Sequence, residues 1–509
     1  MAKRKRDVGI HRNLDSGKAR KAQPVTKGKA SILANATLQN NVAPPRQQRV
    51  TAAAIDHSVR RPQPNKILKT ENHTDVKTEL PSIQIVTGSY ERTLHGFTAS
   101  LTFDRQNLQA RYADSFLFNA HHSAVRCLAL SPLAEDADQG VYLATGGSDE
   151  RINIYSISAA AMPDTDSKGR KLPSIPSLGP NQISEHPMNR ELGTLVHHSS
   201  SITSLHFSSR SKLLSGSEDN TISVSRLRDL EVISTVKAPK PKASGQASGD
   251  SASAGTVPAG INDFAIHPSM KLMVSVGRGE RCMRLWNLVT GKKAGVLNFP
   301  RSVLDSVKEG KYSHGEGRKI KWNWTGDEFA VTFERGVVVF GQDVQPKCAL
   351  LPHKMTKIHQ LAYFTSSDTQ EYLAVSTDNG EILFFDTTEP RAESSELPVL
   401  RPVSYTGGIK HSIKQRIKDF QILDLASSGY AGQLIVAGSS NGDVQLMTIL
   451  DEELRQPASS DGFIGRVSSD VYRTGARITC LEAFVMLAAQ DAGATLSESE
   501  ASSKDSDED

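Results

Sequence analysis

Apolar residues recur along the chain in short runs with alternating polar positions, and the runs come in pairs separated by a polar turn. In the clearest copy, the turn residue Asp149 is followed three, five and six positions later by Ile152, Ile154 and Tyr155. Such alternation, bounded by Gly, Ser, Asn and Asp, predicts antiparallel strands. Seven turn residues meet this test in full or in part: Glu91, Asp149, Asp219, Glu280, Glu334, Asn379 and Asn441.

A further short strand is predicted before six of these turns, and it carries two apolar residues spaced by two or three positions. The copy at Glu91 lacks this strand, whereas the last apolar run of the chain has the spacing of such a strand and no partner after it. Recurrence at roughly 40 residues or more is typical of a β-propeller. We therefore predict an all-β, seven-bladed propeller in which residues 477–484 form the innermost strand of the blade that holds residues 83–97, because this closure removes the open sheet edges.

The repeats resemble WD40 repeats, and several stretches resemble one family of them in particular. These stretches are GSYE at residues 88–91, LVHHSSSIT at 195–203, HPSMKL at 267–272, SVG at 275–277 and RLWNLV at 284–289. They are similar to the PAK-interacting, maintenance-of-killer family of WD40 proteins. The resemblance implies a nucleolar assembly factor of the large ribosomal subunit, and it also implies a possible role in inhibiting p21-activated kinases.

Two histidines, His121 and His198, each lie four residues before a predicted inner strand, where WD40 repeats carry a Gly-His dipeptide. We expect them to hydrogen-bond to the turn residues Asp149 and Asp219 of their own blades, and we place Trp286 in the same structural network. Although both are part of His-His pairs, no further ligands are spaced to converge on a metal ion. The chain also shows no phosphate-binding loop, nucleophile elbow or zinc signature, so no catalytic residue, metal or cofactor is predicted.

Charge separates the chain into three parts, although its formal net charge is only +4. Residues 1–80 carry a net charge of +11, the last 19 residues carry −6, and the rest is close to neutral. We predict a disordered basic arm over 1–80, the propeller over 81–488 with low-complexity loops near 159–190 and 237–260, and a disordered acidic tail over 489–509. The cluster Lys3, Arg4, Lys5 and Arg6 is a candidate for nuclear import, alone or together with RNA contact.

The later blades hold a second group of basic residues near turns and inner-strand starts. If they share a face, they would form a positive surface for ribosomal RNA or an acidic loop: Lys354, Lys357, Lys410, Lys414, Arg416 and Lys418. The four cysteines are far apart in the sequence, which indicates buried thiols in a reducing compartment. There is no run of 18 apolar residues, so no membrane partner is expected.

These observations predict a non-catalytic scaffold of large-subunit (60S) assembly in the nucleolus. Its expected partners are pre-60S assembly factors, ribosomal proteins and pre-ribosomal RNA, the RNA partly through the basic arm. The alternatives are a signalling adaptor that binds and inhibits a p21-activated-type kinase and, with less support, a substrate receptor of a ubiquitin ligase. The sequence leaves open which propeller face binds and whether the protein oligomerises.

Overall fold

The computed structural model describes the part of the chain in which the repeats were found. The described residues are 78–104, 107–133, 140–160, 186, 189–241, 259–310, 313–367, 369–388, 397–409, 413, 415–426, 430–455 and 462–487. All of them belong to one compact unit of the chain, His73–Asp509. The predicted basic arm and acidic tail lie almost entirely outside these residues, so the proposed domain boundaries remain predictions.

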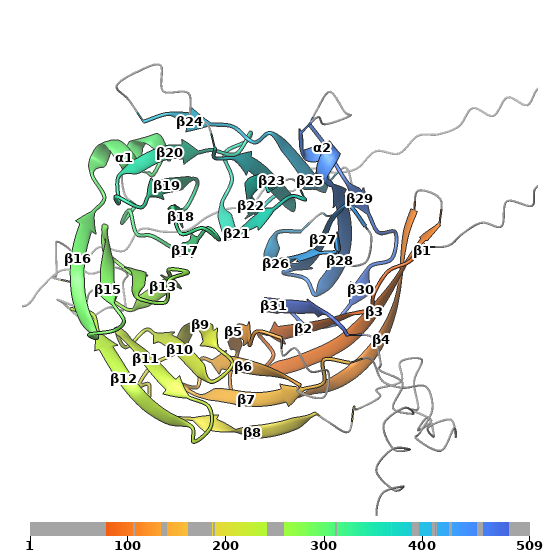
Figure 1. Cartoon of the computed structure of the whole chain (residues 1–509), viewed down its shortest axis with the longest axis horizontal. Helices are drawn as coiled ribbons and strands as arrows, with labels where there is room; N and C mark the ends of the chain where they lie inside the picture. Colours follow the sequence, from red (N-terminus) through yellow and green to blue (C-terminus); the bar gives the residue numbers. More distant parts are fainter. Residues whose placement is uncertain are drawn as a thin grey trace, which may run out of the picture. The chain divides into compact units, whose positions relative to one another are not determined.

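Seven mainly antiparallel sheets surround a central axis, which confirms the predicted seven-bladed propeller (Figure 1). Blades 2, 3 and 4 are plain four-stranded meanders that run outward from the axis. Their strands are β5 (Val125–Leu130), β6 (Val141–Gly147), β7 (Ile152–Ile157) and β8 (Arg190–Leu195); β9 (Ile202–Ser209), β10 (Lys212–Ser217), β11 (Thr221–Arg226) and β12 (Glu231–Lys237); and β13 (Ile261–Ile266), β14 (Leu272–Gly277), β15 (Cys282–Asn287) and β16 (Lys292–Asn298).

Blades 5, 6 and 7 keep the same order but carry irregular outer strands. Their strands are β17 (Lys319–Trp322), β18 (Glu328–Thr332), β19 (Val337–Gly341), β20 (Pro346–Leu350) and β24 (Val399–Leu400); β21 (Ile358–Thr365), β22 (Glu371–Thr377), β23 (Glu381–Asp386) and β25 (Ser404–Gly407); and β26 (Ile417–Asp424), β27 (Gly432–Ser439), β28 (Asp443–Leu450), β29 (Arg466–Val467) and β30 (Tyr472–Arg473). Among the described residues there are two short helices: α1 (Arg301–Ser306) follows the outer strand β16, and α2 (Asp451–Arg455) follows β28.

Blade 1 joins the two ends of the propeller, as the sequence predicted. Its strands are β31 (Ile478–Val485), β2 (Ile83–Ser89), β3 (Thr93–Asp104), β4 (Asn107–Asn119) and β1 (Thr78–Glu79). β31 pairs antiparallel with β2, with Ile83 opposite Val485 and Gly88 opposite Cys480. The last strand of the chain therefore completes the first blade, within one residue of the predicted bounds.

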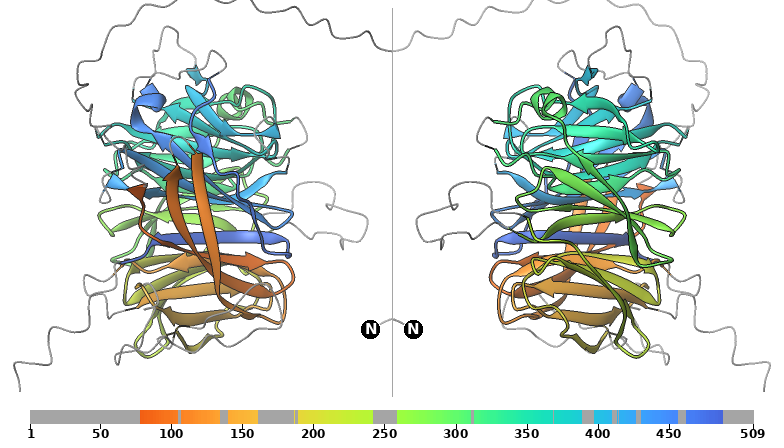
Figure 2. Two further views of the ribbon diagram at one scale, coloured as in Figure 1. Left: turned by 90° about the vertical axis from the view of Figure 1, so that its right-hand side faces the viewer. Right: turned by 90° about the vertical axis from the view of Figure 1, so that its left-hand side faces the viewer.

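The hairpin of β3 and β4 is longer than the other outer strands and reaches the outer strand of blade 7 (Figure 2). Phe97 stacks on Tyr472 of β30 with ring centroids 4.0 Å apart. The hydroxyl of Tyr472 also donates to Asp114, whose Oδ1 lies 2.9 Å from Nε2 of His95. Blades 1 and 7 are thus joined at their outer edges as well as through β31.

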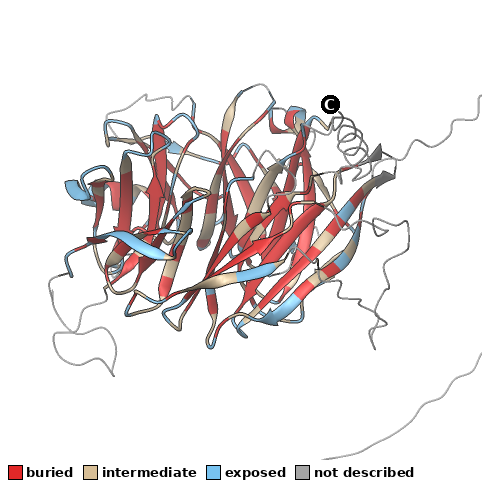
Figure 3. Cartoon of the chain, turned by 60° about the horizontal axis from the view of Figure 1, so that its bottom comes forward, coloured by how far each residue is buried: buried red, intermediate tan, exposed pale blue. Residues whose placement is uncertain are grey.

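The middle strands of the blades bury both faces because each blade packs against two neighbours, whereas the outer strands β12 and β16 are largely exposed (Figure 3). In blade 5, Phe329, Phe333 and Phe340 are at most 1% exposed and pack in a core shared with blade 4. Trp324, in contrast, is 72% exposed in the turn between β17 and β18. Among the described residues, no helix is long and apolar enough to span a bilayer.

Candidate functional site

His121 and Asp149 lie together at the edge of blade 2, in a network that joins the loop before β5 to the turn before β7. Nδ1 of His121 is 2.9 Å from Oδ1 of Asp149, and its Nε2 is 2.8 Å from the hydroxyl of Thr145. The backbone N–H of His122 donates to the second carboxylate oxygen of Asp149 at 2.9 Å. Burial lowers the pKa of His121 despite the neighbouring carboxylate, so the neutral ring is the favoured form.

Blade 3 repeats the arrangement with His198 and Asp219. Nδ1 of His198 is 3.1 Å from Oδ2 of Asp219, and its Nε2 is 2.8 Å from the hydroxyl of Ser215. Burial would raise the pKa of Asp219, but hydrogen bonds from His198, Thr221 and backbone N–H groups lower it well below its usual value. Each carboxylate therefore holds a turn in place through several donors.

In blade 4, other side chains replace the histidine–aspartate pair at the corresponding turn. The indole N–H of Trp286 donates to the hydroxyl of Ser275 at 2.8 Å, but no histidine completes the network. Instead, Arg284 and Glu280 form a bidentate ion pair across the turn, with Nη2 of Arg284 2.7 Å from Oε1 of Glu280 and both side chains about one-tenth exposed. This pair was not predicted, although its spacing of four residues across a tight turn is visible in the sequence.

The cysteines and histidines show no sign of a shared ligand. All four cysteines are free and buried, and burial raises the pKa of the Cys127 and Cys348 thiols to about 12. Within the described ranges, no group of three or more His, Cys, Asp and Glu side chains is arranged to hold a metal ion.

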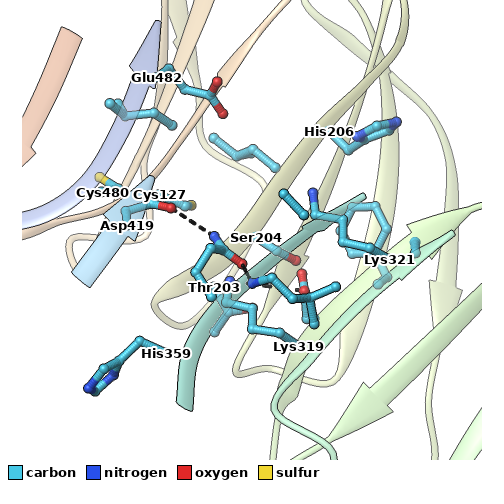
Figure 4. Close-up of a pocket in the computed structure, with 18 of the residues that line it drawn as sticks. Cys127, Thr203, Ser204, His206, Lys319, Lys321, His359, Asp419, Cys480 and Glu482 are labelled. Atoms are coloured by element: carbon cyan, nitrogen blue, oxygen red, sulfur yellow. Dashed lines mark hydrogen bonds and ion pairs between the residues drawn. The ribbon is translucent and has the colours of Figure 1, made fainter. Parts of the chain in front are cut away.

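A central channel of about 1200 Å³ runs between the innermost strands, and most of the charged residues that line it were not predicted from the sequence (Figure 4). Nζ of Lys319 is 4.0 Å from Asp263, which also accepts the backbone N–H of Ile320 from the next blade. Asp419 accepts from Gln360 of blade 6 and from the backbone N–H of Leu481 in blade 1. These aspartates tie neighbouring inner strands together, and their burial explains why they lie in otherwise apolar stretches.

Further into the channel, Glu482 lies on β31 and His206 lies on β9 (Figure 4). Burial and the nearby Asp419 raise the pKa of Glu482 to about 8, against the opposing effect of Lys321. Burial and Lys321 lower the pKa of His206 to about 4. At neutral pH these two groups are therefore mainly uncharged, and Lys321 supplies positive charge to this part of the channel.

The predicted basic surface does not form one unpaired patch. Arg416 and Lys418 line the channel, and burial together with Lys319 and Arg416 lowers the pKa of Lys418. Lys357 pairs with Glu334 at 2.9 Å, and Lys354 is exposed in the preceding loop. The remaining predicted residues lie outside the described part of the chain: Lys3, Arg4, Lys5, Arg6, Lys410 and Lys414.

Comparison with known proteins defines the class first. Residues 189–224, which contain β8, β9, β10, most of β11 and the His198–Asp219 network, match the family described as WD40, the WD domain, G-beta repeat. With its seven blades, the chain is a WD40-repeat protein, and propellers of this class are typically non-catalytic scaffolds.

Several relatives are similar to the chain along most of the propeller. The chain is 24% identical over 404 residues to a p21-activated protein kinase-interacting protein 1-like of Xenopus laevis, covering 79% of this chain and 82% of the relative. It is 25% identical over 327 residues to Protein MAK11 of Saccharomyces cerevisiae, covering 60% and 63%, and 23% identical over 310 residues to Shk1 kinase-binding protein 15 of Schizosaccharomyces pombe, covering 60% and 67%. The chain is thus similar, at modest identity, to PAK-interacting and MAK11 WD40-repeat proteins.

Proposed function

We propose that this protein is a non-catalytic scaffold that takes part in assembly of the large ribosomal subunit in the nucleolus. The observation that carries the proposal is its relation to the PAK-interacting and MAK11 proteins, which extends along most of the propeller. The resembling stretches at residues 88–91, 195–203, 267–277 and 284–289 imply assembly factors of this kind. The scaffold would act by holding partners against a rigid surface, because buried ties between neighbouring blades fix the positions of its turns.

The charge of the N-terminal segment also supports the proposal. A segment of 80 residues with a net charge of +11 is suited to nuclear import and to phosphate contacts that release counterions. Pre-ribosomal particles offer both phosphate backbones and protein surfaces. Lys3, Arg4, Lys5 and Arg6 are the residues that we assign to import and RNA contact.

A second candidate is an adaptor that binds and inhibits a p21-activated-type protein kinase. The names of two relatives favour it, since one is a p21-activated protein kinase-interacting protein 1-like and another is Shk1 kinase-binding protein 15. Kinase binding by a propeller does not need a strongly basic arm, so the arm favours the assembly role.

The decisive experiment is affinity purification of the tagged full chain, followed by identification of the RNA and proteins recovered. We expect large-subunit precursor RNA together with assembly factors and ribosomal proteins. A variant with Lys3, Arg4, Lys5 and Arg6 replaced by Ala, carrying a fused import signal, separates import from RNA contact. Recovery of a protein kinase without precursor RNA would overturn the assembly role and support the adaptor.

A further inference from the structure

The turns that follow the innermost strands lie on one face of the propeller, which we call the first-turn face. Neighbouring turns on this face contact each other, as Nη2 of Arg210 in blade 3 donates to the carbonyl of Gly140 in blade 2 at 2.9 Å. Similarly, Nε2 of His267 in blade 4 lies 3.2 Å from the carbonyl of Gly326 in blade 5. The His121 and His198 networks lie on the opposite face, where the next turn of each blade is found.

Blades 3 and 4 place a group of exposed basic side chains at the first-turn face: Lys212, Arg228, Lys271, Lys292 and Lys293. Their backbones are adjacent within each blade, because Leu227 N–H donates to Ser211 and Leu288 N–H donates to Lys271. The two blades meet at the turn before β16, where a Cβ at Gly291 would lie 3.8 Å from the hydroxyl of Ser234 in β12. β12 and β16 accordingly lie side by side at the rim (Figure 1).

These five cations differ from the others nearby in having no acidic partner within 4.0 Å among the described residues. Arg226, which is opposite Lys212 in the sheet, pairs with Asp229 and with Glu231 at 3.5 Å. On the opposite face, Glu218 pairs with both Arg126 and Arg278, and Glu334 pairs with Lys357. Several cations of the opposite face are thus ion-paired, whereas these five on blades 3 and 4 are not.

Two exposed apolar side chains lie beside these cations, in the turns that follow the innermost strands of blades 4 and 5. Trp324 of blade 5 is 72% exposed and Met270 of blade 4 is 49% exposed, and both line the end of the central channel. The turn that carries Trp324 is fixed, because the ring of Trp322 packs edge-on against His267 with centroids 4.7 Å apart. An indole with a free face on a fixed turn is well suited to stacking against a flat ring.

We propose that the first-turn face of blades 3 and 4 binds single-stranded RNA, with Lys212, Arg228, Lys271, Lys292 and Lys293 contacting phosphates and Trp324 stacking on a base. Cations that follow a backbone beside an aromatic platform are the usual means of binding single strands. An acidic peptide fits less well, because these cations are all exposed and surround no enclosed site for one carboxylate. The inference rests on the proposed function for its biological setting, since pre-ribosomal particles contain such RNA.

Binding of the purified full chain to a fluorescent 20-nucleotide single-stranded RNA of mixed sequence tests the surface. We expect K292E/K293E to weaken binding about tenfold or more and to reduce the slope of log K against log salt by about 1.5. The matched control K237E/K240E changes two lysines on the opposite face, where the N–H of Ala238 donates to the turn residue Asn220. This control should stay within about twofold of the unchanged chain in affinity.

Trp324→Ala should weaken binding about fivefold at every salt concentration and leave the salt slope unchanged, since stacking carries no charge. Tyr90→Ala, which removes an exposed aromatic ring from the opposite face, is its control. Thermal melting of each variant verifies that the propeller is intact, and RNA photo-cross-linking should label the peptide that contains Trp324.

Three results would overturn the proposal: no binding of the RNA by the full chain, equal losses in K292E/K293E and K237E/K240E, or competition by polyglutamate as strong as that by RNA. Its failure is distinct from failure of the assembly role. If K292E/K293E binds RNA in solution as tightly as the unchanged chain, and both recover the same amount of precursor RNA on purification, only the proposed RNA surface is rejected. If K292E/K293E loses affinity in solution as expected, but purification of the unchanged chain recovers no precursor RNA, only the assembly role is rejected.

Discussion

Single carboxylates determine the geometry of the turns at one face of the propeller. Oδ1 of Asp219 accepts from the N–H and the hydroxyl of Thr221, and its Oδ2 accepts from the N–H of Ser199 and lies beside Nδ1 of His198. Removing such a group leaves several buried donors without an acceptor, and each unsatisfied donor costs free energy. The turn therefore depends on one side chain rather than on the propensity of its backbone.

We expect Asp219→Ala to lower the free energy of unfolding by about 2–4 kcal/mol, because a buried charged hydrogen-bonding group is lost. Chemical denaturation monitored by fluorescence measures this change. Asp305→Ala is the matched control, since Asp305 is 57% exposed in its ion pair with Arg301 and such pairs contribute less than about 1 kcal/mol. Equal effects of the two substitutions would contradict the assigned role of Asp219.

The buried carboxyl of Glu482 should make the stability of the folded protein depend on pH. Its pKa is about 8 in the folded protein against an ordinary value of 4.5, so the folded state holds a proton that the unfolded state releases. Stability from this group is therefore present below pH 4.5 and is lost as the pH rises towards 8. Glu482→Gln, which mimics the protonated form, should gain in melting temperature relative to the unchanged chain between pH 5 and pH 8, by about 2 °C or more.

Half-buried Glu381, at the start of β23 and away from the channel, provides the comparison at the residue scale. Glu381→Gln should show no such pH-dependent gain, since no comparable enclosure by inner strands surrounds it. A constant difference between Glu482→Gln and the unchanged chain from pH 5 to pH 8 would be inconsistent with a buried carboxyl in the channel.

Among the elements, β31 has the largest effect on the whole ring because it is the innermost strand of a blade whose other strands come from the opposite end of the chain. Truncation after Gly475 should abolish cooperative unfolding. It should also leave the edge of β2 unpaired and uncover the side of β26 that β31 contacts, and both favour aggregation. Truncation after Leu487, which keeps β31, should leave the melting transition in place. A soluble protein with a cooperative transition after the shorter truncation would disprove the importance of the closure.

The outer contact between blades 1 and 7 is a second closure, and Tyr472 is its centre. Tyr472→Phe keeps the stack on Phe97 but removes the hydroxyl that donates to Asp114, and we expect it to lower the free energy of unfolding by about 1–3 kcal/mol. Tyr90→Phe, at a ring that is 61% exposed, should change it by less than about 0.5 kcal/mol. Equal stabilities would show that the hydroxyl contact contributes nothing.

Strand positions were predictable from the sequence because the period of two is imposed by burial on both blade faces. The turn residues Asp149 and Asp219 were predictable for a different reason, since each has a histidine partner at a fixed place in its repeat. The aspartates of the channel were not, because Asp263 and Asp419 lie at bulges where the alternation shifts by one residue. The contact of Tyr472 with Asp114 joins residues more than 350 positions apart, and no pattern in the neighbouring sequence predicts it.

At the scale of the whole molecule, the N-terminal segment adds a positive region to the unpaired cations of blades 3 and 4. Deleting residues 1–77, which keeps β1 in blade 1, should release the protein from nucleoli, and a fused import signal should restore it to the nucleus without restoring RNA recovery. Fluorescence microscopy and RNA recovery measure the two effects. Deleting residues 491–509, which carry the opposite charge, serves as the control and should leave both unchanged. Unchanged localisation without residues 1–77 would refute the role of the arm.

The pairing of β31 with β2 also has a consequence for synthesis. About 390 residues separate the two strands, so β2 leaves the ribosome long before its inner partner exists. At translation rates of about 5–20 residues per second, the first blade waits on the order of 20–80 s with an unpaired edge. Neither face of the ring is complete during this interval. A nascent or prematurely ended chain therefore lacks the complete propeller surface. Partners that bind this surface would bind only the fully translated protein.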